Sequence, residues 1–455
     1  MAVLIKDCRY LIKNSTTVLE HVDVLVEGSS IKKVGKNIDS PVGSKDLKVI
    51  DASGKVVMPG LVNAHTHLYQ ALLKGVRDDL AFKEWCEKVT FPLANIVHQD
   101  HWNHNDIELG YCWAMLASIE MIKSGTTCFI DMDLTLDSIF QAWLDIGIRG
   151  IGAITAVNRW IPKNLSRGED VRKKEIVKYI EKWNCSSTNQ GLVKVFVAPS
   201  TPFACTPDFL EWLYQTAERY DLGIQIHVSE NLWEVENSIQ ETGYPPMEYL
   251  ERLNLLRRPI SAVHCVHLQD HEIEMAKESG VTVVYNPKSN MKLGSGTAPI
   301  VKMLQKGVPV ALATDGPASN DLMDMFEEMR TGALLQKVAW HDPSVISAND
   351  MFHMATVNGA RAAGINAGTI EEGKLADLII LDLFQAHSMP LHDIIQTVVY
   401  CAKGSDVETT IINGKVVMEN KKLLTIDEKE TLNRIHHLAR TKLARWDDRQ
   451  LTAEF

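Results

Sequence analysis

The chain has 455 residues, 45% of them hydrophobic, so it can bury a large core and we expect one large domain with a smaller satellite. Its formal net charge is −11 at pH 7 without long runs of like charge, which argues against a nucleic-acid or other polyanion partner. No apolar stretch nears the ~18 residues of a membrane span and no signal peptide is recognisable, so we expect a cytoplasmic protein without membrane partners.

The two ends of the chain share a β pattern. Residues 3–57 contain short alternating strands, and the same pattern returns at 376–382 and 409–417. Within 409–417, Asn413-Gly414 fits a tight hairpin turn between two strands. We therefore expect the two ends to pair into one β-sandwich.

Between these ends, strand-like apolar runs alternate with helix-length segments such as 108–124 and 207–220, the pattern of parallel βα units. Eight such runs end near His65, Asp131, Thr155, Ser200, His227, His264, Asn286 and Asp315. Eight βα units in roughly 300 residues predict an α/β fold of the (β/α)8 barrel type, whose functional site lies at the carboxyl ends of the strands.

Three parts are expected from this organisation. Residues 1–57 and 369–425 form the composite β-sandwich, and residues 58–368 form the barrel. Residues 426–455 form a C-terminal extension, whose stretch 427–446 has helical spacing and is expected to pack across the surface.

Candidate metal ligands stand at several predicted strand ends. His65 and His67 close the first apolar run, and residues two apart in a strand point to the same side, so both can face the barrel interior and bind one ion. An HxH pair alone is a weak signal. His227, His264 and Asp315 end later strands, so five such side chains converge on one barrel mouth.

His65, His67, His227 and Asp315 make a set of three nitrogens and one carboxylate, which suits zinc or ferrous iron and leaves room for a water. Such an ion lowers the pKa of its water from about 15.7 towards ~7, which gives a nucleophile at neutral pH. Glu230 follows His227 by three residues and can reach over the metal as a proton shuttle.

A single metal ion is expected. Barrel hydrolases with two metals commonly need a bridging carboxylated lysine at the end of a central strand, but the fourth predicted strand ends in Ala198-Pro199-Ser200-Thr201. His264 is then free to orient or polarise the hydroxide rather than complete a second site.

Five motifs together resemble the amidohydrolase superfamily. They run from Pro59 to His67, Ile226 to Glu230, His264 to Leu268, Asn286 to Gly296 and Thr314 to Asp321. The branch that they resemble holds methylthioadenosine and S-adenosylhomocysteine deaminases and the s-triazine hydrolases, including melamine deaminase and atrazine chlorohydrolase. The resemblance spans nearly the whole chain, including both flanking β segments.

The resemblance implies a hydrolase of carbon–nitrogen bonds in cyclic amidines, which replaces an exocyclic amino group of a nitrogen heterocycle with hydroxyl and releases ammonia. It implies the same four ligands for one divalent ion, Zn²⁺ first and Fe²⁺ as the alternative. The implied catalytic residues are Glu230, the acid that protonates a ring nitrogen, Asp315, the acceptor of the water proton, and His264. It also implies a homo-oligomer, a dimer or higher, whose interface the sequence does not show.

Candidate substrate contacts are Glu84, Trp85, Thr201 and Asn290. Glu84 matches the position where related nucleoside deaminases place a glutamate on ribose hydroxyls, although an ordinary surface carboxylate is an equal alternative. Thr201 stands where those deaminases carry a histidine, and it is a weaker partner for purine or ribose. The 8-oxoguanine deaminases and triazine hydrolases also lack that histidine.

The remaining motifs favour deamination. Residues 414–423 look more like the triazine hydrolases, but Asp315-Gly316 looks like the deaminases, since the chlorohydrolase has asparagine after its metal aspartate. The expected substrate is a purine nucleoside of the S-adenosylhomocysteine or methylthioadenosine type, with an s-triazine hydrolase or a guanine or 8-oxoguanine deaminase as alternatives. Cyclic-amide hydrolysis and a non-catalytic metal scaffold account less well for the combination of Glu230 and His264.

Two further groups of residues are weaker candidates. His98, His101 and His104 form an HxxHxxH cluster, which we expect on a helix or lid rather than at a second metal, because no carboxylates or cysteines converge with it. Four tryptophans could line a heterocycle pocket, and we expect one or two to contact substrate. They are Trp85, Trp102, Trp113 and Trp160.

Overall fold

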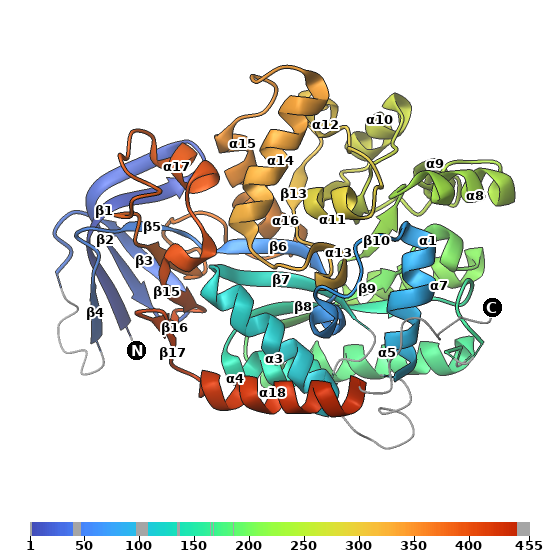
Figure 1. Ribbon diagram of the computed structural model, residues 1–455, viewed down its shortest axis with the longest axis horizontal. Coiled ribbons are helices and arrows are strands. Elements are labelled where there is room, and N and C mark those ends of the chain that lie inside the picture. The colour runs from blue at the N-terminus through green and yellow to red at the C-terminus, as the bar shows by residue number, and fades with distance from the viewer. Residues whose placement is uncertain are drawn as a thin grey trace.

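The computed structural model describes residues 2–39, 47–96, 108–133, 137–163, 165–166, 168–184 and 186–443. Its middle part is a ring of parallel strands surrounded by helices, and a large sheet built from both chain ends lies beside it (Figure 1). Across those ranges, no helix combines the length and apolar character that a membrane crossing needs.

The barrel strands form two four-stranded parallel sheets, β6-β7-β8-β9 and β10-β11-β12-β13. Their bounds are β6 Leu61–Thr66, β7 Thr126–Asp133, β8 Arg149–Ala156, β9 Val193–Pro199, β10 Gln225–Val228, β11 Ser261–His264, β12 Thr282–Tyr285 and β13 Val310–Leu312. Val197 pairs with Ile224 between β9 and β10, and the amide of Asp315 donates to the carbonyl of His65, 3.1 Å away, between β13 and β6. The two sheets therefore close into the predicted (β/α)8 barrel.

Helices follow the strands around the outside of the barrel. The longer ones are α3 Glu108–Lys123, α4 Asp137–Ile146, α5 Glu169–Trp183, α7 Pro207–Tyr220, α8 Leu232–Thr242, α10 Asp270–Glu278, α12 Ile300–Lys306 and α14 Met325–Trp340. The start of α7 shows why a helix begins there: the Thr206 hydroxyl accepts the amide of Phe209, and Pro207 occupies the first turn, where its missing N–H costs nothing.

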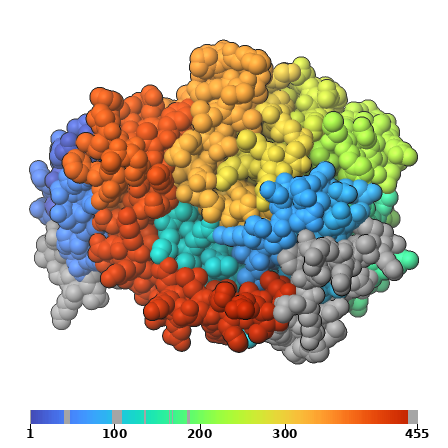
Figure 2. All heavy atoms as spheres, in the orientation of Figure 1, coloured from blue at the N-terminus to red at the C-terminus, as the bar shows by residue number. Residues whose placement is uncertain are grey.

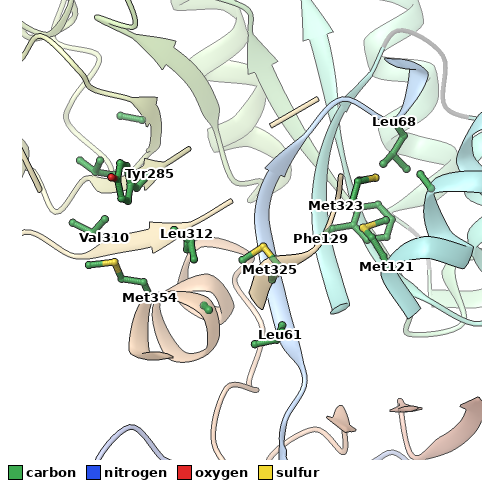
Figure 3. Close-up of a cluster of buried hydrophobic side chains, with 14 of the residues drawn as sticks. Leu61, Leu68, Met121, Phe129, Tyr285, Val310, Leu312, Met323, Met325 and Met354 are labelled. Carbon is green, nitrogen blue, oxygen red and sulfur yellow. The ribbon is translucent and has the colours of Figure 1, made fainter. Parts of the chain in front are cut away.

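Apolar side chains fill the layer between the strands and these helices. Figure 3 shows part of it: Leu61 of β6 and Leu312 of β13 lie near Met325 at the start of α14. All three side chains are fully buried, and burial of each such side chain contributes roughly 1.5 to 3 kcal/mol. This packing holds β6 and β13, which end at the candidate metal ligands, against one another.

Short elements occupy loops after the strands, the connections from α5 to β9 and from α8 to β11, and the return to the sheet. They are η1 Leu68–Leu73, α1 Phe82–Trp85, η2 Cys86–Thr90, α6 Ser186–Asn189, η3 Pro202–Ala204, α9 Pro246–Arg252, α11 Pro287–Lys292, α13 Pro317–Asn320, α15 Ala348–His353, η4 Met354–Asn358, α16 Gly359–Ala362, α17 Ile394–Tyr400 and η5 Gly404–Asp406. Several of them carry the side chains of the candidate site.

The second sheet confirms that the two chain ends pair. Its nine strands are β1 Ala2–Asn14, β2 Thr17–Glu27, β3 Ser30–Gly35, β4 Leu47–Asp51, β5 Val56–Pro59, β14 Leu378–Leu381, β15 Val407–Ile412, β16 Lys415–Glu419 and β17 Lys422–Leu423. The antiparallel pairing of β5 with β14 joins the N-terminal and C-terminal strands, and side chains such as Val24 and Ile411 share one core. The predicted hairpin turn has Asn413 and Gly414 at positive φ, as a tight two-residue turn requires.

The C-terminal extension begins with helix α18, Glu428–Lys442, which lies along α3 (Figures 1 and 2). Lys123 donates to Glu428, and Arg434 donates to Glu108, so the two helices are joined by ion pairs. The predicted helix at 427–446 is thus observed through residue 442 and packs on the surface as expected. Figure 2 shows N-terminal residues, in blue, beside residues of the C-terminal part, in orange and red, at one end of the molecule.

A buried ion pair joins the sandwich to the barrel. Arg149, at the start of β8, donates from Nε to Asp377 Oδ2 at 2.7 Å and from Nη2 to Oδ1 at 3.2 Å, and the two side chains are 6% and 2% exposed. Nη2 also donates to the Asn413 side chain at the hairpin turn. We propose that the sandwich and barrel are separate domains with boundaries near residues 57 and 369, held together at this contact.

Replacing Arg149 with methionine leaves the Asp377 carboxylate buried without its cation, so we expect the free energy of unfolding in urea to fall by about 3 to 5 kcal/mol. The double variant Arg149→Met/Asp377→Asn should lose less, because no charge is then left buried. The control is Arg252→Met, which removes an exposed i,i+4 pair with Glu248 and should cost at most ~1 kcal/mol. Equal losses in Arg149→Met and Arg252→Met would contradict this account.

Candidate metal and catalytic site

Three imidazoles and one carboxylate meet at the carboxyl ends of β6, β10 and β13. His65 Nε2 lies 3.3 Å from His227 Nε2 and 3.4 Å from Asp315 Oδ1, and His67 Nε2 lies 3.6 Å from the same Asp315 oxygen. The side chains of His65, His67 and Asp315 are 0%, 13% and 7% exposed, and His227 is buried. The structure therefore brings together the four residues that the sequence singled out as ligands.

The other ring nitrogen of each histidine is tied to a carbonyl oxygen. His65 Nδ1 donates to the side-chain oxygen of Gln225 at 2.8 Å, and the Nδ1 atoms of His67 and His227 donate to the backbone oxygens of Met132 and Ser200 at 2.7 Å. A neutral imidazole with its proton on Nδ1 keeps a lone pair on Nε2. All three lone pairs are thus fixed towards the same point.

This arrangement fits a divalent metal ion. Burial and the neighbouring His65 lower the pKa of His67 to about 4, and burial with the same neighbour lowers the pKa of His227 well below its usual range, so these rings are neutral. Facing lone pairs only 3.3 Å apart repel one another unless a cation lies between them. The donor set of three nitrogens and one carboxylate oxygen is the one expected from the sequence.

Asp315 divides its two oxygens between different tasks. Oδ1 faces the histidines and accepts the amide of Gly316 at 2.7 Å, whereas Oδ2 accepts the hydroxyls of Ser289 at 2.5 Å and Ser319 at 3.2 Å. Burial alone would raise the pKa of Asp315, but its close contact with His65 and the other imidazoles around it outweigh that effect and hold the pKa well below its usual range. The group is therefore a carboxylate.

Glycine is required directly after this aspartate. A Cβ atom on Gly316 would lie 1.9 Å from the side-chain oxygen of Gln70, which accepts the amide of Ala318. This close approach holds η1, which follows His67, against α13, which follows Asp315. The segments that follow His67 and Asp315 are thereby held against each other.

Glu230 and His264 lie beside the four ligands. Burial, followed by the negative charges of Asp315 and Glu234, raises the pKa of Glu230 well above its usual range, which favours the protonated form of this carboxyl. His264 Nε2 lies 3.8 Å from Glu230 Oε2, and its Nδ1 accepts hydrogen bonds from the amide groups of Asn286 and Asn290 at 3.1 and 3.0 Å. With both amide groups donating to Nδ1, the proton of the His264 ring is on Nε2, so this histidine can donate a hydrogen bond into the site. Its ring also lies close enough to His65 and His227 for the three to hold one ion.

A cavity opens in front of these groups, with about 970 Å³ of space not filled by atoms, its open mouth included. Glu230, His264 and Asp315 line one part, and apolar side chains line most of the rest. The structure therefore offers a catalytic end and a hydrophobic binding wall.

Trp160 is the centre of that hydrophobic wall. Its ring stacks on Phe82 at 6.2 Å and contacts Phe91, Phe203 and Trp233 at 5.2 to 5.4 Å. Trp160 adopts a φ of 46°, a conformation that is strained for a bulky residue and is held here by the surrounding rings. Such strain clusters at ligand sites.

The four expected substrate contacts fall into two pairs. Trp85 and Thr201 line the cavity, and the Thr201 hydroxyl also accepts the amide of Ala204. Glu84 is outside the lining, with a side chain 57% exposed and 3.6 Å from Lys88, so its contact with ribose stays a prediction. Asn290, which we expected to contact substrate, is instead buried behind His264 and outside the lining.

The tryptophans and the histidine cluster, the weaker candidates from the sequence, also fall into different places. Trp85 and Trp160 line the cavity, whereas Trp113 is buried in the core and donates to Asp133. Trp102 and the cluster His98, His101 and His104 lie outside the described residues.

The sequence did not reveal the residues that orient the histidines and the aspartate of the site. Gln225, Ser289 and Asn286 are ordinary polar residues near strand ends, and no spacing distinguishes them from residues that cap a turn. The motif from Asn286 to Gly296 did contain a usable signal. A polar segment that starts a helix directly after a barrel strand can place several side chains into the site at the strand ends. Glu234, whose carboxylate accepts the amides of Ser229 and Glu230, was also missed.

Comparisons with known proteins agree with this geometry. A profile described as "Amidohydrolase family" matches residues 56–417. A 5-methylthioadenosine/S-adenosylhomocysteine deaminase from Caldanaerobacter subterraneus subsp. tengcongensis is 40% identical over 432 residues, which is 94% of this chain and 95% of that protein.

Solved structures give the same fold. An adenosine deaminase from Xanthomonas campestris with bound zinc is 30% identical, covers 97% of this chain and 98% of its own, and has a TM-score of 0.88. Atrazine chlorohydrolase from Arthrobacter aurescens, complexed with zinc, also has a TM-score of 0.88 over 96% of this chain and 100% of its own, at 24% identity, which supports the fold alone. Since the family profile matches most of its length, the chain belongs to the amidohydrolase family.

Proposed function

We propose that this amidohydrolase is a metal-dependent deaminase, which replaces the exocyclic amino group of a purine nucleoside of the 5′-methylthioadenosine or S-adenosylhomocysteine type with hydroxyl and releases ammonia. The observation that carries the proposal is the convergence of His65, His67, His227 and Asp315 beside the buried Glu230, whose raised pKa favours a protonated carboxyl. Relatives named 5-methylthioadenosine/S-adenosylhomocysteine deaminase, 38 to 40% identical over more than nine-tenths of the chain, support the substrate type.

The proposed ligands of one divalent ion are His65, His67, His227 and Asp315. Zinc is the proposed metal because the adenosine deaminase structure from Xanthomonas campestris, 30% identical to this chain, contains it, and Fe²⁺ is the alternative for the same donor set. When bound, such an ion supplies the Lewis acidity that makes water nucleophilic near neutral pH. A cytoplasmic location and a homo-oligomeric state remain predictions from the sequence.

Glu230 and Asp315 divide the proton transfers between them. Glu230, protonated, donates to the ring nitrogen next to the amine-bearing carbon, which makes that carbon electron-poor. Asp315, ionised, accepts the proton of the attacking water and can return it to the leaving amine. His264 donates from Nε2 to the attacking oxygen and so fixes its direction.

The alternatives concern the heterocycle. The hydrophobic wall around Trp160 fits a purine nucleoside, a free purine base or an alkylated triazine, and Thr201 is a weak ribose partner. An s-triazine hydrolase and a guanine or 8-oxoguanine deaminase therefore remain the second candidates. Glu84 does not distinguish between these substrates, since it lies outside the cavity lining.

The first test is ammonia release by the purified, metal-loaded protein. We expect turnover of methylthioadenosine, S-adenosylhomocysteine or adenosine, measured against guanine, 8-oxoguanine, melamine and a chlorotriazine. Activity confined to the free bases or triazines would overturn the nucleoside proposal while leaving the deaminase reaction standing. Chloride release without ammonia would overturn both.

Metal removal provides a second test. A chelator should abolish ammonia release, and one equivalent of Zn²⁺ per chain, counted by elemental analysis, should restore it. His67→Asn should lose the ion because it removes one fixed lone pair. The control His271→Asn, at an exposed helix position, should keep one ion, and full activity of the metal-free protein would reject the assignment.

Glu230→Gln should keep one bound ion and lower kcat by about 10² to 10⁴-fold, because the amide cannot donate the proton of a carboxyl. Metal content and kcat are measured on the same preparation. Glu236→Gln, at an exposed carboxylate on α8, the helix that follows Glu230, is the matched control and should leave both unchanged. A Glu230→Gln protein with normal kcat would be incompatible with the proposed acid.

A further inference from the structure

Glu234 is a buried carboxylate for which the proposed proton transfers give no role. It lies in the first turn of α8, one helical turn after Glu230, and only 2% of it is exposed. Its Oε1 accepts the backbone amide of Ser229 at 3.0 Å, and its Oε2 accepts the backbone amide of Glu230 at 2.7 Å. One side chain thus holds two successive peptide N–H groups, one on each oxygen.

The backbone held in this way is unusual. Ser229 has a φ of 52°, a left-handed conformation that a residue with a Cβ rarely adopts. The carbonyl of Ser229 accepts the amide of His267, and Val228 accepts the amide of Cys265, so the segment after β11 holds the other side of the same turn. The turn that carries Glu230 is therefore fixed between α8 and β11, and Glu234 supplies the α8 side.

The cost of burying a carboxylate makes this contact informative. Burial raises the pKa of Glu234 to about 7, and the two hydrogen bonds from the backbone amides of Ser229 and Glu230 oppose that rise and offset the cost of burying the carboxylate. Ordinary helix capping does not need this carboxylate, because the side chain of Asn231 already caps α8 by accepting the amide of Glu234. The hydrogen bonds of the Glu234 side chain go instead to the residue that carries the proposed acid.

We propose that Glu234 is a positioning residue for the deamination, which clamps the backbone of Ser229 and Glu230 and so aims the Glu230 carboxyl at the substrate ring. The inference rests on the proposed function, because it acts through Glu230. It predicts that Glu234 matters for the rate only as long as Glu230 can donate its proton.

The central variant is Glu234→Gln. The amide keeps one acceptor oxygen but turns an NH₂ group towards the second backbone N–H, so the turn shifts and Glu230 is misaimed. Since small misplacements of a catalytic group are costly, we expect kcat to fall on the order of 10- to 100-fold, with KM within a few-fold and one ion still bound. Glu234→Asp, which keeps the charge but is one methylene shorter, should show a smaller loss and serves if the glutamine variant does not fold.

Glu272→Gln is the matched control. Glu272 is also fully buried and also accepts a backbone amide, that of Gln269, in the first turn of the next barrel helix, α10. Both glutamine variants should lower the melting temperature, but only Glu234→Gln should lower kcat. An equal fall of kcat in both would assign Glu234 to general stability and overturn the proposal.

A double-variant cycle with Glu230→Gln separates positioning from structure. In that background, Glu234→Gln should lower the remaining kcat by less than about threefold, since residues that act as a unit are not additive. A full 10- to 100-fold fall in the Glu230→Gln background would reject a role that runs through Glu230.

Amide hydrogen exchange of the peptide that contains Ser229 and Glu230 provides a readout that needs no substrate. Exchange should be faster in Glu234→Gln than in the wild-type protein and unchanged in Glu272→Gln. Unchanged exchange in Glu234→Gln would overturn the clamp. If the wild-type protein released ammonia from none of the test substrates, the proposed function would be rejected instead. The exchange experiment would still decide whether Glu234 holds this backbone.

Discussion

The mutual repulsion of three imidazole lone pairs and a carboxylate, brought within 3.3 to 3.6 Å of one another, is the constraint on which the site depends. A cation at their centre turns this repulsion into attraction. The barrel makes the approach possible, because His65 and His67 on β6, His227 on β10 and Asp315 after β13 all stand where parallel strands end. Closure of the ring between β13 and β6 is therefore part of the metal site as well as of the fold.

Orientation of these groups comes from a surrounding layer of hydrogen bonds. The imidazoles donate to Gln225 and to backbone carbonyls, which fixes their tautomers, whereas His264 accepts from two asparagine amides and so presents a donor. In the proposed site, the same ring type thus serves as metal ligand in three places and as hydrogen-bond donor in one. The hydrogen-bond partner of Nδ1, an acceptor in three rings and a donor in the fourth, makes this difference.

Two buried carboxyl groups acquire opposite protonation states in the same way. Glu230 lies among apolar and negatively charged neighbours, which favour its neutral form, while Asp315 lies among imidazoles and hydroxyls, which favour its anion. An acid and a base can therefore work side by side at one pH. Glu234 links this chemistry to the fold, since its carboxylate both holds the Glu230 backbone and adds negative charge nearby.

The sequence by itself determined the barrel, the pairing of the chain ends and the four residues that meet at its mouth. Strand periodicity places His65 and His67 on one side, and βα alternation brings distant strand ends together, so local patterns suffice. Only the tertiary structure decided that Asn290 supports His264, that Glu84 lies outside the cavity lining and that Glu234 clamps Glu230. Those roles depend on side-chain directions and on packing between segments far apart in the chain, such as β6 and β13, and no local spacing encodes them.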